Sequence, residues 1–190
     1  NYDDKIIELN KLINQYPRSA FIDDALFEIA KTNETKGNLN EAIEGYANLI
    51  KQLAQSNFTK KAYLQLGLIY YNKSDYDLSL ENYKNVVENY PNSEESRAAL
   101  VGIKNNYLDK NNVDGYFAYT NSLGDQISIS INEQDSIFYM AAEKSYMSQN
   151  PEAGIQLESY ISLFPEGSFK INALFYLAEF NYQNEKYSKS

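Results

Sequence analysis

Acidic residues are the first candidates for chemistry in this chain of 190 residues. They occur as adjacent pairs at residues 3–4, 23–24 and 94–95, and paired carboxylates can act as general acids and bases or bind calcium. None of the pairs lies in the D-x-[DN]-x-[DN]-G loop of a calcium site. Each pair falls near an expected helix start, where negative charge complements the helix dipole. We therefore interpret the pairs as structural.

The absence of two residue types narrows the possible chemistry further. The chain has no His and no Cys, so it lacks the usual general base near neutral pH, the commonest metal ligand and any thiol nucleophile. Its serines occur in neither a G-x-S-x-G elbow nor a suitable S-x-x-K motif. The sequence predicts that the chain is not an enzyme and that it holds no metal and no cofactor.

The charge of the chain excludes other classes of partner. Lys and Arg number 17 against 26 Asp and Glu, which gives a net charge of −9. A nucleic-acid-binding protein needs a basic face to displace the counterions of phosphate, so we expect no nucleic acid here. An anionic membrane surface is excluded for the same reason. With no run of 18 apolar residues, direct membrane insertion of the chain is not expected.

The elements that must position any binding residues follow from an internal repeat. A related phrase occurs three times: YPRSAFIDDAL at 16–26, YPNSEESRAAL at 90–100 and FPEGSFKINAL at 164–174. Its prolines are separated by 74 residues. At half that spacing an apolar series continues unbroken through Leu26, Tyr63, Leu100, Ile137 and Leu174. Such self-similarity predicts an array of 37-residue repeats.

Each repeat has the pattern of two helices. In the clearest copy, Tyr63, Leu66, Gly67 and Tyr70 follow the i, i+3, i+4, i+7 spacing of one helix face. A second apolar face covers 76–90 and ends at Pro91, which cannot continue a helix. The next helix then starts after a serine N-cap, and the serines expected in this role are Ser19, Ser93 and Ser168.

The pattern predicts a single all-α domain over residues 1–190. Helices are expected near 4–15, 23–36, 40–54, 60–72, 76–89, 97–109, 113–123, 135–148, 152–163 and 170–183. The expected subdivision is the second helix of a truncated repeat at 1–22, repeats at 23–59, 60–96, 97–133 and 134–170, and the first helix of a further repeat at 171–190.

The repeat resembles a known family. The pattern Tyr63-x2-Leu66-Gly67-x2-Tyr70, followed by a small residue at 79, an aromatic residue at 83 and a proline at 91, is similar to the tetratricopeptide repeat (TPR). This resemblance covers the chain, is strongest over 60–100 and is weakest over 97–133. It implies a right-handed α-α superhelix, a solenoid of helix-turn-helix repeats. It also implies a non-catalytic scaffold that binds a protein or peptide partner.

The length of the repeats implies a cellular context. Long repeats that end in Tyr-Pro-x-Ser resemble bacterial cell-envelope members of the family, such as outer-membrane assembly lipoproteins and proteins of the Tol–Pal coordinator type. The resemblance implies a periplasmic or outer-membrane-associated location within a larger envelope protein or lipoprotein.

The repeat at 97–133 departs from the pattern in two ways. Lys104 and Tyr116 stand where small residues belong, so its two helices are expected to splay. The stretch 126–132 alternates apolar and polar residues with period two, which is a strand signal. We interpret it either as an extended linker along the solenoid edge or as an exposed edge that pairs with a partner strand.

The resemblance also implies which residues bind a partner. In TPR solenoids the first helix of each repeat lines a concave surface, and Tyr suits binding because it brings a large contact area and a hydroxyl group. Many of these tyrosines can equally pack between neighbouring first helices. The residues carried over are Lys31, Leu68, Tyr71, Asn72, Asn105, Leu108, Tyr139, Tyr146, Tyr176 and Tyr182.

Two further hypotheses stand beside the scaffold. The chain starts within an expected second helix and stops as another begins, so it could be a structural spacer or self-assembly segment that associates through its ends. It could also be a carbohydrate-binding solenoid, which would need Tyr71, Tyr139 or Tyr176 exposed side by side.

Overall fold

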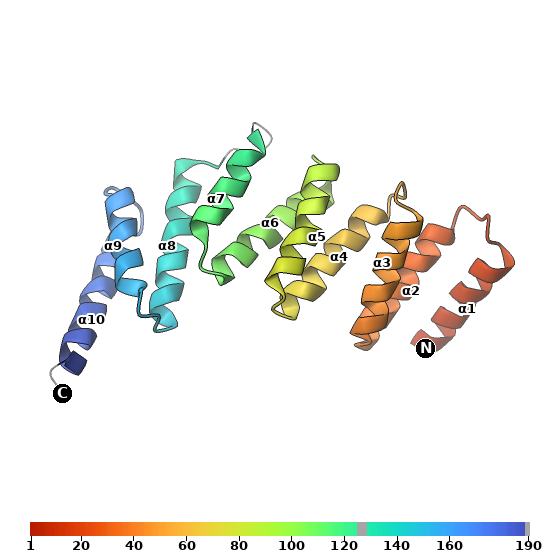
Figure 1. Cartoon of the computed structure of the whole chain (residues 1–190), viewed down its shortest axis with the longest axis horizontal. Coiled ribbons are helices and arrows are strands. Elements are labelled where there is room, and N and C mark those ends of the chain that lie inside the picture. Colours follow the sequence, from red (N-terminus) through yellow and green to blue (C-terminus); the bar gives the residue numbers. More distant parts are fainter. Residues whose placement is uncertain (125–128, 189–190) are drawn as a thin grey trace. The chain divides into compact units, whose positions relative to one another are not determined.

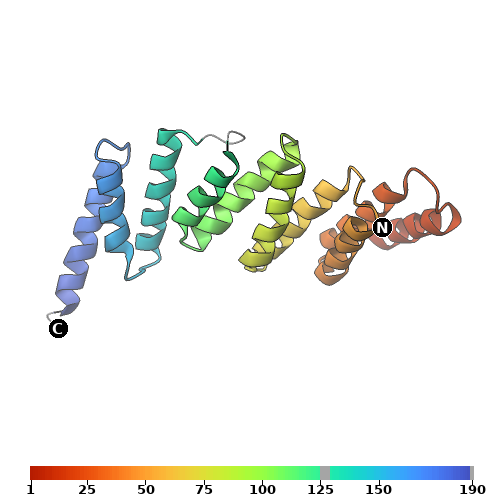
Figure 2. The same cartoon turned by 45° about the horizontal axis from the view of Figure 1, so that its top comes forward.

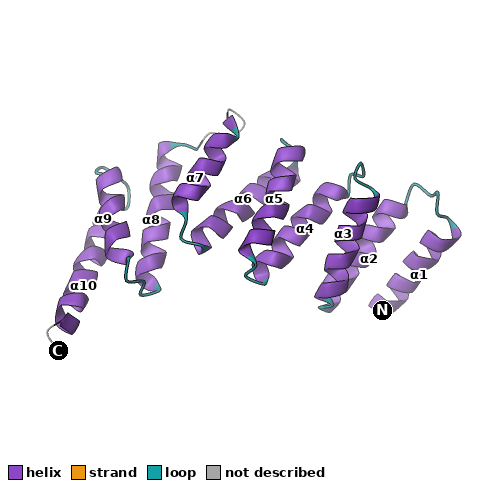
Figure 3. Cartoon of the chain, viewed as in Figure 1, coloured by secondary structure: helices purple, strands orange, loops and turns teal. Residues whose placement is uncertain are grey.

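A computed structural model describes residues 1–124 and 129–188, with side chains described through Asn184. These residues contain ten α-helices and no strand, as Figure 3 shows. The predicted all-α fold of paired helices is confirmed. The helices are α1 (Tyr2–Gln15), α2 (Ile22–Lys36), α3 (Leu39–Gln52), α4 (Thr59–Asn72), α5 (Tyr76–Asn89), α6 (Glu94–Asp109), α7 (Val113–Ser122), α8 (Ile131–Met147), α9 (Ala153–Leu163) and α10 (Lys170–Ser188).

The chain divides into two compact units. The N-terminal unit is Asn1–Asn106 and the C-terminal unit is Tyr107–Ser190. The boundary lies within α6, inside the segment 97–133 whose sequence departs most from the repeat pattern.

Helix pairs build the N-terminal unit. In both Figure 1 and Figure 2, α2 lies beside α3 and α4 beside α5, while α1 packs on α2 and α3 on α4. One core cluster is formed by the apolar faces of α2, α3 and α4, as expected for amphipathic helices. This core comprises Phe27, Ala30, Ala42, Tyr46, Leu49, Ala62, Leu66 and Ile69.

One close helix crossing occurs where the sequence places small residues. A Cβ atom on Gly67 of α4 would lie 2.6 Å from the ring of Tyr83 of α5. The hydroxyl of Ser79, also on α5, donates a hydrogen bond of 2.8 Å to the Gly67 carbonyl. A larger residue at Gly67 would hold the two helices apart, so the predicted close approach of this pair is confirmed.

One of the three predicted serine N-caps is present. The Oγ atom of Ser93 accepts a hydrogen bond of 3.0 Å from the Ser96 N–H at the start of α6. The prediction is wrong for Ser19, because α2 begins only at Ile22 and the Ser19 hydroxyl accepts from the Phe21 N–H within the preceding turn. It is also wrong for Ser168, because α10 begins only at Lys170, two residues later.

The C-terminal unit contains its own core. Helices α8, α9 and α10 pack against one another, and the buried residues at their centre are Tyr139, Ala142, Leu157, Tyr160 and Ala173. The carboxylate of Asp135 is 5% exposed and connects these elements. It accepts hydrogen bonds of 2.5 Å from the Tyr160 hydroxyl and 2.8 Å from the Ser168 N–H.

The strand signal at 126–132 was misleading in its described part. Residues 125–128 lie outside the described residues, but Ile131 and Asn132 are the first residues of α8. The Oγ atom of Ser130 caps this helix by accepting from the Glu133 N–H at 3.2 Å. The Ser-x-x-Glu spacing of a capping box therefore prevailed over the alternating pattern.

Across the described residues, each helix is too short or too polar to cross a membrane.

Candidate functional site

Two helix faces meet at a cavity in the N-terminal unit. Leu64, Leu68 and Tyr71 recur at i, i+4 and i+7 on α4, and Ala98, Val101 and Asn105 recur at i, i+3 and i+7 on α6. Because this spacing places residues on one helix face, the two sets form opposite walls. The cavity between them has a volume of about 280 Å³. We refer to it as the α4–α6 cavity, and Gln65, Tyr83 and Gly102 complete its lining.

The floor of the α4–α6 cavity is the ring of Tyr83, which reaches it from α5. The ring is 4% exposed and lies between two glycines. A Cβ atom on Gly102 would lie 2.4 Å from the ring, as close as the clash at Gly67 on the other side. Any side chain at Gly102 would therefore displace the ring that forms the floor. Burial raises the pKa of Tyr83 to about 12, so the phenol is neutral at physiological pH.

A buried polar network below the cavity holds the three helices in register. The side-chain amide of Asn106 on α6 donates to the Ser79 Oγ atom at 3.0 Å and to the Gly102 carbonyl at 2.8 Å. Ser79 in turn donates to the Gly67 carbonyl of α4. Because each of these donors is buried and paired, a change in the spacing of the three helices would leave a polar group unsatisfied.

The walls of the α4–α6 cavity combine exposed apolar side chains with uncharged polar ones. Leu68 is 41% exposed and Val101 is 54% exposed. The polar lining consists of the amides of Gln65 and Asn105 and the hydroxyl of Tyr71. No acid–base pair or metal-ligand set occurs in this lining, and the described residues contain no group of three or more His, Cys, Asp or Glu that could hold a metal. Such a surface suits the binding of an apolar side chain.

Three of the ten predicted partner-binding residues lie together in this cavity. Leu68, Tyr71 and Asn105 belong to its lining. Asn72, the last residue of α4, is exposed beyond it. Lys31 is exposed on α2, outside the cavity. Leu68 and Asn105, which are one repeat apart in the sequence, thus line the same cavity.

Two of the predicted residues are buried rather than presented at a surface. Leu108 is 9% exposed and Tyr139 is 4% exposed. The Tyr139 ring stacks on Phe169, with centroids 4.5 Å apart, and its hydroxyl donates to Glu143. Neither side chain is therefore available at a binding surface in this structure. Tyr139 belongs instead to the core of the C-terminal unit.

The other three predicted tyrosines lie in the C-terminal unit. The rings of Tyr146 and Tyr176 stack with centroids 4.7 Å apart, and both are half-buried. The Tyr146 hydroxyl donates a hydrogen bond of 2.8 Å to Glu179, and this bond, with burial, raises the pKa of the phenol. Tyr182 is 66% exposed on α10.

The carbohydrate hypothesis required exposed tyrosines side by side. Tyr139 does not meet this condition because its ring is covered by Phe169. Tyr176 stacks on Tyr146, whereas Tyr71 belongs to the other unit.

Several residues of the α4–α6 cavity were not predicted. They are Leu64, Gln65, Tyr83, Ala98, Val101 and Gly102. The helical spacing of Leu64 with Leu68, and of Val101 with Asn105, could have revealed Leu64 and Val101. The repeat pattern aligns Lys104 with Gly67, and nothing in the sequence alone indicates that Gly102 contacts Tyr83 instead.

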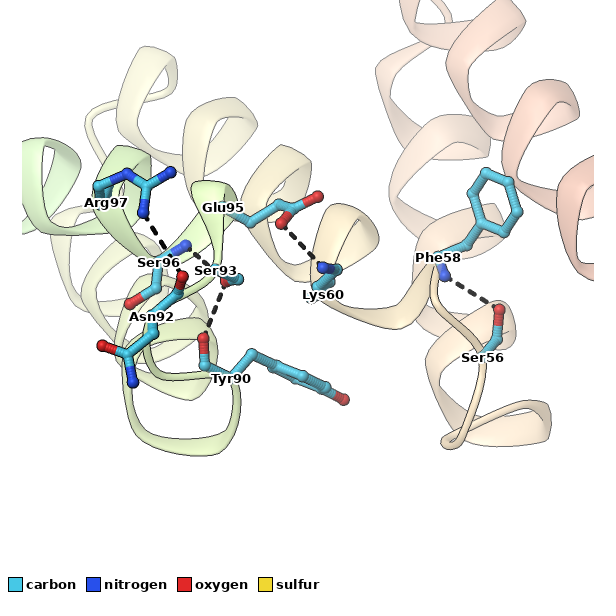
Figure 4. Close-up of polar contacts among 9 residues, drawn as sticks. All are labelled: Ser56, Phe58, Lys60, Tyr90, Asn92, Ser93, Glu95, Ser96 and Arg97. Carbon is cyan, nitrogen blue, oxygen red and sulfur yellow. Dashed lines mark hydrogen bonds and ion pairs between the residues drawn. The ribbon is translucent and has the colours of Figure 1, made fainter.

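A second cavity lies at the turns of the N-terminal unit. It has a volume of about 640 Å³ and lies where the turn between α3 and α4 faces the turn between α5 and α6. Figure 4 shows Tyr90 extending from one turn toward the loop with Ser56 and Phe58. We refer to this space as the turn cavity. Its lining is Ile50, Ala54, Gln55, Ser56, Asn57, Thr59, Lys60, Tyr63, Asn89, Tyr90, Pro91 and Ser93.

Lys60, the charged residue of the turn cavity's lining, forms an ion pair with Glu95 of α6. The Lys60 ammonium lies 3.1 Å from the Glu95 carboxylate, as Figure 4 shows. Burial alone would raise the pKa of the Glu95 carboxyl, but its own backbone N–H and the Lys60 ammonium hold it below its ordinary value. The Glu95 carboxylate therefore offsets the charge that Lys60 brings to the cavity wall.

Comparison with known proteins gives a match for two of the helix pairs. No curated protein matches the chain at a significant level. Residues 24–56 and 61–93, about a third of the chain, match a family model. These segments contain most of α2 with α3 and of α4 with α5. The family that both segments match is the tetratricopeptide repeat.

Proposed function

We propose that the chain is a non-catalytic protein–protein interaction scaffold and that the α4–α6 cavity binds a segment of its partner. Tetratricopeptide repeats generally mediate protein–protein interactions, and stacked repeats offer extended binding surfaces. The observation that carries the proposal is the cavity itself, in which Leu68 and Val101 remain exposed although both are apolar.

The partner segment would place one apolar side chain between Leu68 and Val101, above the Tyr83 ring. Burial of a side chain of this kind contributes about 1.5–3 kcal/mol. The amides of Gln65 and Asn105 can each donate and accept, so they suit the peptide groups on either side of the buried residue. One cavity therefore supplies part of the affinity, and the neighbouring repeats supply the rest.

A peptide selection tests this proposal directly. We expect peptides selected from a random library on the full chain to share one apolar residue. We expect Leu68→Glu to weaken their binding by about tenfold or more, because a carboxylate in the cavity would lose about 1.4 kcal/mol or more of affinity. The matched control is Leu78→Glu, since Leu78 is a leucine of similar exposure on α5, outside the cavity.

Equal binding of the selected peptides to the wild-type chain and to Leu68→Glu would contradict the proposal. Loss of binding in both glutamate variants would do the same, since it would place the binding surface elsewhere.

A self-assembly role has one specific observation in its favour. Helix α10 exposes Ile171, Leu174 and Phe175, at 81%, 45% and 58%. In the repeat pattern, Leu174 corresponds to Ile137 of α8, which is 2% exposed. We infer that this face of α10 associates with a second apolar helix. Sedimentation of the wild-type chain and of Phe175→Glu tests this, and a wild-type monomer at high concentration would contradict it.

We also propose a periplasmic or outer-membrane-associated location within a larger bacterial envelope protein. The support is the resemblance of the Tyr-Pro-x-Ser repeats to those of envelope proteins. Fractionation of cells that express the native protein is the test, and recovery in the cytosolic fraction alone would contradict the proposal.

A further inference from the structure

The turn that carries Ser93, at the turn cavity, lacks a hydrogen bond that the turn one repeat earlier forms. In the N-terminal unit, Asp23 accepts a hydrogen bond of 2.7 Å from the hydroxyl of Ser56, 33 residues later. One repeat further along, the same positions are Lys60 and Ser93. A lysine cannot accept a hydrogen bond, and Lys60 pairs with Glu95 instead. The turn that carries Ser93 is thus not tied to the start of α4 as the earlier turn is tied to α2.

The serine and threonine hydroxyls that line the turn cavity form hydrogen bonds within the fold. Ser93 donates to the Tyr90 carbonyl and accepts from the Ser96 N–H. The hydroxyl of Thr59 donates to the Leu53 carbonyl at 2.8 Å. These hydroxyls are therefore paired within the fold, and Lys60, the charged residue of the lining, is paired with Glu95.

Four other polar groups of the lining are available. Among the described residues, no hydrogen bond is formed by the side-chain amides of Gln55 and Asn57 or by the phenols of Tyr63 and Tyr90. Each of these groups can both donate and accept. Tyr63 and Tyr90 are half-buried, so each ring also presents part of its surface.

We propose that the turn cavity binds a neutral saccharide. The hydroxyl groups of a sugar both donate and accept hydrogen bonds, which matches the two amides and the two phenols, and its C–H face packs against an aromatic ring. The cancelled charges of Lys60 and Glu95 give no advantage to a phosphate or a carboxylate. The volume of about 640 Å³ lies within the range of small-molecule sites. This site is independent of the α4–α6 cavity and of the proposed partner binding.

Titration of the full ¹⁵N-labelled chain with saccharides tests the proposal. The probes are maltotriose and N,N′-diacetylchitobiose as neutral ligands and a galacturonic acid disaccharide as an anionic one. We expect at least one neutral probe to cause saturable shifts of the backbone amides of Asn57 and Asn89, without shifts along α4 near Leu68. Asn57→Ala and Tyr90→Ala should each weaken this binding by about tenfold, or about 1.4 kcal/mol.

The matched control is Tyr16→Ala. Tyr16 precedes Pro17 as Tyr90 precedes Pro91, but it does not line the turn cavity. The control variant should bind like the wild type. The proposal is wrong if neither neutral probe gives saturable shifts in the wild type, if only the anionic probe binds, or if the Asn57 and Tyr90 variants bind as well as the control.

Discussion

Single residues limit how closely the helices of the N-terminal unit can approach. Gly67 is the clearest case, because an added Cβ atom would lie 2.6 Å from the Tyr83 ring. We expect Gly67→Leu to lower the free energy of unfolding by about 1–3 kcal/mol through overpacking. Chemical denaturation followed by circular dichroism measures this loss.

A double-mutant cycle separates overpacking from a general effect of the substitution. When Tyr83 is already alanine, Gly67→Leu should cost less, because the ring that it displaces is absent. An unchanged cost in the Tyr83→Ala background would show that the two residues are not in contact.

Contacts between elements hold the turn before α10 against α8. The Asp135 carboxylate of α8 accepts from both the Tyr160 hydroxyl of α9 and the Ser168 N–H of that turn. We expect Asp135→Ala to cost about 1–3 kcal/mol, because it leaves two buried donors without an acceptor. Amide hydrogen exchange should show the loss across α8, α9 and α10.

Asp135→Asn is the matched control for this element. Its amide oxygen keeps one acceptor in nearly the same volume, so the loss should be smaller than for alanine. Equal losses in the two variants would mean that the side-chain volume, and not the hydrogen bonds, stabilises the turn.

At the scale of the whole molecule, buried tyrosines make both units sensitive to alkaline pH. Burial raises the pKa of Tyr83 in the N-terminal unit and of Tyr160 in the C-terminal unit from 10.0 to about 12. For Tyr160, the hydrogen bond to Asp135 adds to the effect of burial. The folded chain therefore binds these protons more tightly than the unfolded chain. Their contribution to stability is complete below pH 10 and is lost as the pH rises through 12.

Unfolding as a function of pH, followed by circular dichroism and tyrosinate absorbance, measures this loss. We expect Tyr83→Phe to move the alkaline transition of the N-terminal unit to higher pH, since it removes the titrating group and keeps the ring. A transition that stays at the wild-type pH would mean that Tyr83 ionises without a cost to the fold.

Local sequence features were sufficient to predict the all-helical architecture. The apolar spacing over 60–90 and the repeated prolines specify helices and their ends, because both act within one or two turns of chain. The same register correctly placed Gly67 at a helix crossing. It also brought Leu68, Tyr71 and Asn105 to one cavity, because equivalent positions of stacked repeats lie on neighbouring faces.

The depth at which each side chain lies was decided by the tertiary structure alone. Leu108 and Tyr139 occupy expected surface positions yet are buried. The α4–α6 cavity exists because Gly102 lets the Tyr83 ring lie between two helices. A position in the repeat determines which face of its helix a residue occupies. Whether that face is open or covered depends on the side chains of other helices, which meet it only when the chain is folded.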